Sequence, residues 1–344
     1  MRYHLLGRSA LRVSELCLGT MTFGEEWGWG ASADESRRIF DAFVAAGGNF
    51  IDTANRYTEG TSERLVGEFV RSDRERFVIA SKYTLFTRKG DPNAAGNHRK
   101  NLVQSLDATL TRMGLEYLDL YWIHAWDFTT RADEVMRALD DQVRAGKILH
   151  VGVSDTPAWI VSRAQAIAEL RGWTPFTALQ VEHSLIERTV ERDLIPMARA
   201  LELAVTPWSP LAGGTLTGKY LDAATATGRV QPTAERRNER NTEVARAVVD
   251  LAREIGRTPA QVALTWLRHR DYTSIPILGA RTLAQLEDAV GCVDLVLTAE
   301  QRSRLDAASA ITLGFPHDFL ARPNVRDLVS GATWEETEHP APRA

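Results

Sequence analysis

The feature that most constrains the fold is an alternation of short β-type runs with amphipathic helical stretches. The alternation continues through most of the 344 residues. A pattern of this kind predicts β-α-β units whose strands are parallel. Eight β-type runs can be read in order, and we expect strands at 15–19, 49–52, 77–82, 118–124, 148–154, 178–181, 204–208 and 274–278.

An open doubly wound sheet that binds a dinucleotide usually carries a G-x-G-x-x-G motif after its first strand. This chain has no such motif. Eight strands that each precede a helical stretch therefore favour a closed barrel, so we predict an α/β fold of the (β/α)8 type, the TIM barrel.

Two further features surround the predicted barrel. Runs at 3–6 and 11–14 flank a turn and predict an N-terminal β-hairpin. Helical stretches near 242–255, 259–270, 282–290 and 299–309 imply two helices beyond the eight of the barrel. We expect one domain over residues 1–330 and a flexible tail over 331–344, which is rich in charge and proline.

Helix starts are marked by capping residues. Ser32 and Glu35 have the spacing of a capping box. Thr156 and Thr258 each precede a proline, a pattern that predicts an N-cap followed by proline at the first helical position.

Composition and charge narrow the class of partner. The net charge of −4 and the pI near 6.1 provide no basic field for nucleic acid or an anionic membrane. We find no apolar run of about 18 residues and no leader-like N-terminus, and expect a cytoplasmic protein. Cys17 and Cys292 lie in apolar surroundings and predict buried free thiols. No group of His, Cys and Asp has metal-ligand spacing, so no metal site is expected.

Three predicted strands finish with an ionisable residue. Side chains alternate faces along a strand, and Asp52, Lys82 and His124 each follow apolar residues on their own face. The carboxyl ends of barrel strands carry the active site. We therefore expect these three side chains to meet at one mouth, with Tyr57 on the loop above them.

The segments GGNFIDTANRY, ASKY, LDLYWIH and TPWSPL resemble the signatures of the aldo-keto reductase superfamily. The resemblance extends over about residues 1–320, in order. It implies that Asp52, Tyr57, Lys82 and His124 form the catalytic tetrad, that the cofactor is NADP(H), and that the substrate is a small aldehyde or ketone.

The chemistry of carbonyl reduction explains these residue types. A tyrosine with a pKa near 10 keeps its proton at neutral pH and acts as the acid, while a nearby ammonium lowers that pKa. The resemblance implies that Lys82 supplies the ammonium, that Asp52 balances its charge, and that His124 orients the carbonyl.

The resemblance also predicts where the cofactor binds. Trp208 is expected to stack on the nicotinamide, and Ser154 and Gln180 to hydrogen-bond its carboxamide. Relatives often have asparagine where this chain has Asp155, which accepts from an amide NH2 but cannot donate to its oxygen. The full predicted set is Ser154, Asp155, Gln180, Trp208, Ser209, Pro210, Leu211, Gly213, Leu216, Gly218, Lys219, Gly279, Arg281, Gln285 and Asp288.

Two of these predictions involve a choice between alternatives. The run from Gly213 to Lys219 satisfies G-x-x-x-x-G-K, the pattern of a P-loop, but Tyr220 stands where a P-loop needs Ser or Thr. We therefore favour a glycine-rich loop whose backbone comes close to the cofactor pyrophosphate over the P-loop of an NTPase. Arg281 follows the last strand and is expected to pair with a 2′-phosphate, which predicts NADP over NAD. Ala289 replaces an asparagine of the family pattern, so one adenine contact is expected to be missing.

The substrate side is less defined. Trp27, Phe86 and Trp126 lie on predicted mouth loops and are expected to line an apolar pocket, with Phe315 and Phe319 as further candidates. The chain also resembles the potassium-channel β-subunits, so an NADPH-binding regulatory subunit with little turnover is the alternative function. A homo-oligomer is compatible with either.

Overall fold

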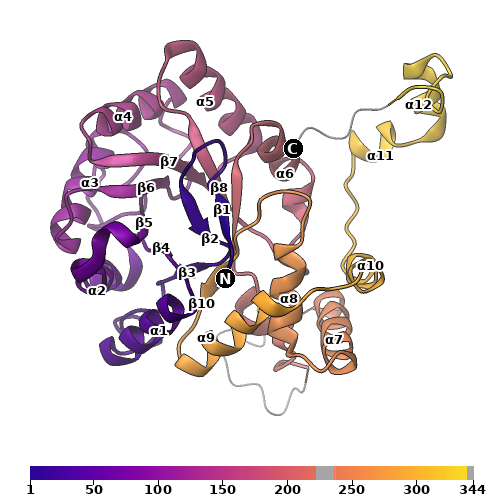
Figure 1. Cartoon of the computed structure of the whole chain (residues 1–344). Helices are drawn as coiled ribbons and strands as arrows, with labels where there is room; N and C mark the ends of the chain where they lie inside the picture. The colour runs from indigo at the N-terminus through magenta and orange to yellow at the C-terminus, as the bar shows by residue number, and fades with distance from the viewer. Residues whose placement is uncertain (222–235, 237, 339–344) are drawn as a thin grey trace.

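The computed structural model describes residues 1–221, 236 and 238–338. Its centre is a ring of eight parallel strands in the order β10-β3-β4-β5-β6-β7-β8-β9 (Figure 1), so the predicted barrel is confirmed. The strand bounds are β3 (Cys17–Gly19), β4 (Phe50–Asp52), β5 (Val78–Tyr83), β6 (Leu118–Ile123), β7 (Ile148–Ser154), β8 (Phe176–Glu182), β9 (Ala204–Trp208) and β10 (Ile277–Gly279).

The ring closes between β9 and the residues just before β10. Val205 donates its backbone N–H to the carbonyl of Thr273 at 2.9 Å, and Ile275 donates to the carbonyl of Val205 at 2.8 Å. The last strand is therefore shorter and later than the predicted 274–278, because residues 273–275 provide the closing contact instead of a full ladder.

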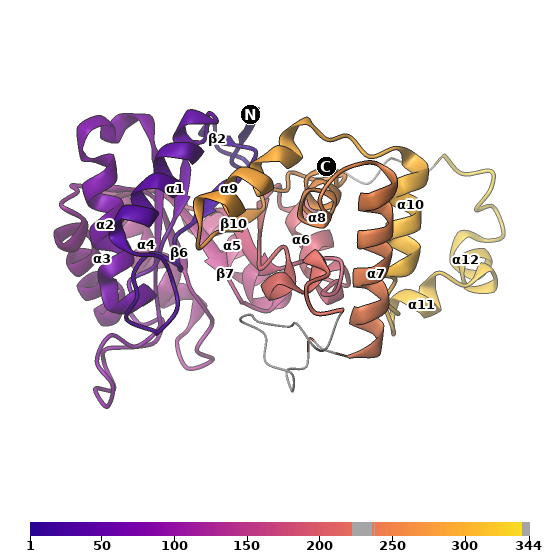
Figure 2. The same cartoon turned by 90° about the horizontal axis from the view of Figure 1, so that it is seen from below.

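Helices surround the ring and cover the outer faces of the strands (Figures 1 and 2). Two helices go beyond a simple alternation, because β9 is followed by both α7 and α8, and α9 after β10 is followed by α10. The bounds are α1 (Ala33–Ala45), α2 (Thr61–Val70), α3 (Arg99–Met113), α4 (Ala132–Arg144), α5 (Ala158–Arg171), α6 (Leu194–Ala200), α7 (Glu239–Glu254), α8 (Pro259–Arg268), α9 (Leu283–Val290) and α10 (Ala299–Ala308).

The predicted N-terminal hairpin is present as β1 (Tyr3–Leu5) and β2 (Arg12–Ser14). It lies across the centre of the ring in Figure 1. Leu6 and Val13 pack onto the residues that fill the barrel interior, which include Phe50, Ala80 and Trp122. The hairpin thus covers the amino-terminal end of the barrel and leaves the carboxyl end for the site.

Capping agrees with the sequence at one helix and differs at two. Thr258 caps α8 with Pro259 at the first position, as predicted. At α1, Ser32 accepts from Glu35 N, but the Glu35 carboxylate accepts from Leu283 N at 2.7 Å instead of closing a capping box. At α5 the N-cap is Pro157, because the Thr156 hydroxyl donates to the Ser154 carbonyl.

The chain continues past α10 into α11 (His317–Leu320) and α12 (Pro323–Ser330), two short helices that the sequence analysis does not predict. They project away from the barrel in both views (Figures 1 and 2). Phe315 and Phe319 contact each other on this arm, with ring centroids 6.1 Å apart, and both are exposed. Residues 222–235 and 237, and residues 339–344 of the predicted tail, lie outside the described residues.

Cys17 and Cys292 are buried free thiols, as predicted. Throughout the described part of the chain, every helix is too short or too polar to cross a bilayer.

The packing of α2 against α3 gives a test of the fold. A Cβ added at Gly67 would lie 2.1 Å from the backbone carbonyl oxygen of Met113, a contact that no rotamer change relieves. We expect Gly67→Ala to lower the free energy of unfolding by about 3 kcal/mol, the upper part of the range for overpacking. Chemical denaturation measures this, with Glu68→Ala at an exposed position of the same helix as the control. Equal stability of the two variants would contradict the packing.

Candidate active site

A buried ion pair lies at the carboxyl end of the barrel. Asp52 is the last residue of β4, Lys82 lies near the end of β5, and the two residues are 2% and 0% exposed. Lys82 Nζ donates to Asp52 Oδ2 and to the carbonyl of Thr53 at 2.9 Å. The backbone acceptor at Thr53 is a part of the site that side-chain patterns could not reveal.

Tyr57 is held beside this pair by an unusual turn. Lys82 Nζ donates to the Tyr57 hydroxyl oxygen at 3.1 Å. The next two residues, Thr58 and Glu59, have φ of 45° and 54°, a region that residues other than glycine rarely adopt. The Thr58 hydroxyl donates to the carbonyl of Phe23 at 2.7 Å and fixes the turn. The strained turn therefore sets the position of the phenol.

The charges around Tyr57 act in opposite directions. Burial raises the pKa of the Tyr57 phenol, and this effect outweighs the lowering by the charge of Lys82. Lys82 therefore lowers the pKa of Tyr57 as predicted, but the net shift is upward because burial, which the sequence analysis did not include, is the larger effect. Burial alone would lower the pKa of Lys82, but Asp52 and Tyr57 together raise it. Lys82 stays an ammonium and Tyr57 stays protonated at neutral pH.

His124 follows β6 and completes the predicted tetrad. Its ring lies edge-on to the Tyr57 ring, with centroids 5.8 Å apart and an interplanar angle of 84°. Burial, helped by the charge of Lys82, holds the pKa of His124 well below its usual value. The imidazole is therefore neutral, and its Nδ1 is buried without a partner in the described residues. Asp52, Tyr57, Lys82 and His124 are thus brought together as predicted.

Gln180 connects this cluster to the neighbouring strands. It lies on β8, is 3% exposed, and donates from Nε2 to Asp52 Oδ1 at 3.2 Å. Ser154 is paired with Gln180 in the ladder between β7 and β8 and is 1% exposed. The structure thus brings both predicted carboxamide contacts to the same side of the mouth, with a link to Asp52 that the sequence did not indicate.

The next strand ends add an aromatic residue and a carboxylate. Trp208 ends β9, and its indole Nε1 donates to Asp155 Oδ1 at 3.0 Å. Asp155 follows β7 with a φ of 40°. Its carboxylate therefore holds the Trp208 ring, a role that the sequence analysis missed.

The segment after β9 contains further predicted cofactor residues, including the P-loop-like run from Gly213 to Lys219. Ser209, Pro210 and Leu211 lead into the short helical turns η4 (Ala212–Thr217). Gly213, Gly214 and Gly218 all have positive φ, so glycine is needed here for the backbone path as well as for close approach to a ligand. Leu216 is fully buried, which makes it a packing residue of this loop, and Lys219 is exposed.

The predicted phosphate and adenosine residues lie between β10 and α9. Gly279 ends β10 with open space around the position of a Cβ. Gln285 Oε1 accepts from Arg281 N at 2.9 Å, and the Asp288 carboxylate accepts from Gln261 Nε2 at 3.1 Å. In the described part of the chain, the Arg281 guanidinium forms no ion pair. Arg281 is therefore available to an external anion, whereas Asp288 is engaged with α8.

Two of the predicted substrate residues form one wall of the mouth. The Trp27 and Tyr57 rings lie edge to face, with centroids 6.5 Å apart. The guanidinium of Arg56 lies 5.9 Å from the Trp27 ring and 4.9 Å from the Phe86 ring, and pairs with Glu59. Sequence reasoning missed Arg56, because only the fold brings these loops together.

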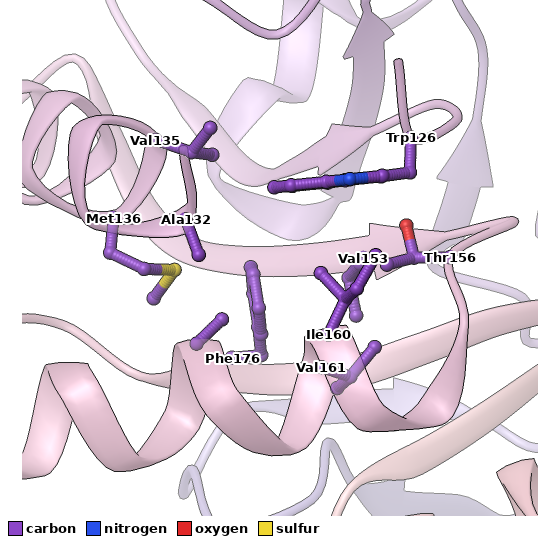
Figure 3. Close-up of a pocket in the computed structure, with 10 residues that line it drawn as sticks. Trp126, Ala132, Val135, Met136, Val153, Thr156, Ile160, Val161 and Phe176 are labelled. Carbon is purple, nitrogen blue, oxygen red and sulfur yellow. The ribbon is translucent and has the colours of Figure 1, made fainter. Parts of the chain in front are cut away.

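Trp126 has a different environment. Its ring lines a narrow apolar pocket between α4, α5 and the outer faces of β7 and β8 (Figure 3). Val135, Val153 and Phe176 are among the other lining residues, and the space is too tight to admit water. The indole therefore packs the helical layer, and only its partly exposed remainder is left for the mouth. Phe315 and Phe319 do not contribute to the wall formed by Trp27 and Phe86, since both lie on the projecting arm that contains α11 and α12.

Comparison with known proteins agrees with this geometry. The model of the Aldo/keto reductase family matches residues 15–310. A norsolorinic acid reductase from Aspergillus flavus is 37% identical over 330 residues, which is 92% of this chain and 84% of the relative. An aryl-alcohol dehydrogenase [NADP(+)] from Phanerodontia chrysosporium is 34% identical over 355 residues, which covers 97% of this chain and 92% of the relative.

A putative aryl-alcohol dehydrogenase from Saccharomyces cerevisiae is 33% identical over 336 residues, 93% of this chain and 89% of the relative. A parallel barrel with a Tyr–Lys–Asp–His cluster at its carboxyl end defines an oxidoreductase that acts on carbonyl or alcohol groups. The chain belongs to the aldo/keto reductase family.

The buried ion pair can be tested by its stability. Lys82→Met leaves the Asp52 carboxylate buried without its cation, so we expect the free energy of unfolding to fall by about 3–5 kcal/mol. The double variant Asp52→Asn/Lys82→Met removes both charges and should recover most of this loss. Urea denaturation of both variants measures the difference. A double variant as unstable as Lys82→Met would contradict the electrostatic explanation.

Proposed function

We propose that this protein reduces aldehydes or ketones to alcohols with NADPH, and that Tyr57 is the general acid. The observation that carries the proposal is the 3.1 Å contact between Lys82 Nζ and the Tyr57 hydroxyl oxygen. Because Lys82 occupies a lone pair of that oxygen, the phenolic hydrogen is left to point into the mouth. This is the arrangement that a proton donor to a carbonyl requires.

The described residues fit the cofactor. Thr215 Oγ1, on the loop after β9, is buried and lacks a hydrogen-bond partner in the described structure, as expected for a group that a ligand satisfies. Arg281 is free of acidic partners there, and Gly279 leaves open space beside it. One relative is named for its use of NADP(+), which supports a 2′-phosphate as the partner of Arg281.

The chain's own residues perform the rest of the mechanism. NADPH, when bound, would supply the hydride that the carbonyl carbon accepts. Tyr57 donates its proton to the carbonyl oxygen, and Lys82 stabilises the phenolate that remains. Neutral His124 hydrogen-bonds the same oxygen and orients it. Asp52 keeps Lys82 in place and charged, so the ammonium is ready before the substrate arrives.

We propose aromatic and other medium-sized carbonyl compounds as the substrate class. Trp27 and Phe86 offer ring faces and edges on the wall beside Tyr57. The names of two relatives, both aryl-alcohol dehydrogenases, support this class. We also propose a cytoplasmic location, supported by the two buried free thiols, which suit a reducing compartment.

The acid role predicts a specific defect. Tyr57→Phe keeps the ring and removes the proton, so we expect kcat for 4-nitrobenzaldehyde to fall by about 10²–10⁴-fold while the NADPH Kd changes little. Loss of absorbance at 340 nm measures turnover, and fluorescence quenching measures binding. Tyr117→Phe, before β6 at the opposite end of the barrel, is the matched control. Unimpaired turnover by Tyr57→Phe would contradict the role. A wild type that binds NADPH but never consumes it would favour the regulatory subunit.

The titrations around the site predict a flat pH profile. A group whose pKa is raised, such as Tyr57, stays protonated below that pKa, and a group whose pKa is lowered, such as His124, stays neutral above it. The reductive kcat/KM should therefore show no inflection between about pH 7 and 9, a range that lies between the usual pKa values of these two groups, about 6.5 and 10. A fall of activity through pH 7–8 would show that another group supplies the proton.

The 2′-phosphate assignment predicts a loss of selectivity. Arg281→Ala should weaken NADPH binding by about 10-fold or more and leave NADH binding within about 2-fold, since only NADPH carries the phosphate. Titration of both cofactors measures the two Kd values. Arg253→Ala, an exposed arginine on α7, is the control. Equal weakening of both cofactors would remove Arg281 from this role.

A further inference from the structure

Asp155 and Trp208 form a pair across the mouth of the barrel. Asp155 follows β7 and Trp208 ends β9, so the two flank β8 and its residue Gln180. The indole N–H of Trp208 donates to Asp155 Oδ1 at 3.0 Å, which holds the carboxylate at the edge of the indole ring. A ring that stacks on this indole would lie about 3.5–4 Å from its plane. The carboxylate would then lie about 5–7 Å from the centre of the stacked ring.

The charges at this side of the mouth do not cancel. Lys82 compensates Asp52, Arg236 compensates Glu182, and the lowered pKa of His124 keeps that ring neutral. Asp155 forms no ion pair with any described residue, and its carboxylate accepts a hydrogen bond from the uncharged Trp208. One negative charge is therefore left over beside Trp208, the residue on which the nicotinamide is expected to stack. A carboxylate in that position attracts a positively charged ring and not a neutral one.

We infer that Asp155 makes the site bind the oxidised cofactor more tightly than the reduced one. The inference rests on the proposed function and goes beyond it. Reduction of the carbonyl transfers a hydride from the neutral nicotinamide to carbon and a proton from Tyr57 to oxygen, and the nicotinamide is left with one positive charge. Only this oxidised form gains the attraction of Asp155, which acts as a positioning and charge-setting residue.

The size of the effect follows from the distance. Two unit charges about 6 Å apart, in surroundings between protein surface and water, interact strongly enough to change binding about 10-fold. For a two-electron couple, a 10-fold change in the ratio of the two Kd values shifts the potential of the bound cofactor by about 30 mV. The bound cofactor becomes a stronger reductant, which favours carbonyl reduction and slows release of the oxidised form.

The test compares binding of the two cofactor forms. Asp155→Asn keeps an oxygen that can accept from Trp208 and removes the charge, and asparagine tolerates the positive φ of this position as well as aspartate does. Asp155→Gly also suits that φ and serves as a second variant, in case the amide turns its NH2 toward the indole. Asp91→Asn is the matched control, because it removes an exposed carboxylate from the loop after β5.

Fluorescence titration of the purified protein with NADP⁺ and with NADPH, at one pH and ionic strength, gives the two Kd values. We expect Asp155→Asn and Asp155→Gly to raise the Kd of NADP⁺ about 10-fold relative to that of NADPH, and Asp91→Asn to leave the ratio unchanged. A ratio within 2-fold of the wild type in both Asp155 variants would overturn the inference. Failure of the wild type to bind either form would instead overturn the proposed function, so the two failures are distinguishable.

Discussion

The rest of the site depends on the burial of Lys82 as a charged ammonium. An ammonium with 0% exposure is stable only where its charge and its hydrogen bonds are satisfied, and Asp52, Thr53 and Tyr57 supply the partners. Each partner comes from β4 or from the loop that follows it, while Lys82 comes from β5. The adjacency of these two strands in the barrel is therefore what makes the pair possible.

The stability of this cluster and its proposed chemistry have the same origin. The low-dielectric surroundings that make an unpaired Lys82 costly also keep Tyr57 protonated and His124 neutral. The strained turn at Thr58 and Glu59 then fixes the phenol against the ammonium. Strain of this kind persists only where the surrounding structure holds it in place, which here is the contact of Thr58 with the Phe23 carbonyl.

The two sides of the mouth differ in charge and in the side chains that line them. On one side, Trp27, Arg56 and Phe86 form a wall from the loops after β3, β4 and β5. On the other side, Asp155 follows β7 and Trp208 ends β9, and the carboxylate of Asp155 has no ion-pair partner among the described residues. The proposed substrate and cofactor therefore meet different environments around the same phenol, and the departure of this chain at Asp155 falls on the cofactor side.

The sequence by itself determined the eight strands and the hairpin, because periodic patterns and turn residues act locally. It also identified Asp52, Lys82 and His124, since each ends a predicted strand in which the preceding residues on the same face are apolar. Only the tertiary structure decided the net direction of the Tyr57 pKa shift, the packing of Trp126 under α4 and α5, and the contact of Asp155 with Trp208. These depend on which distant segments become neighbours and how much water they exclude, and no local pattern encodes that.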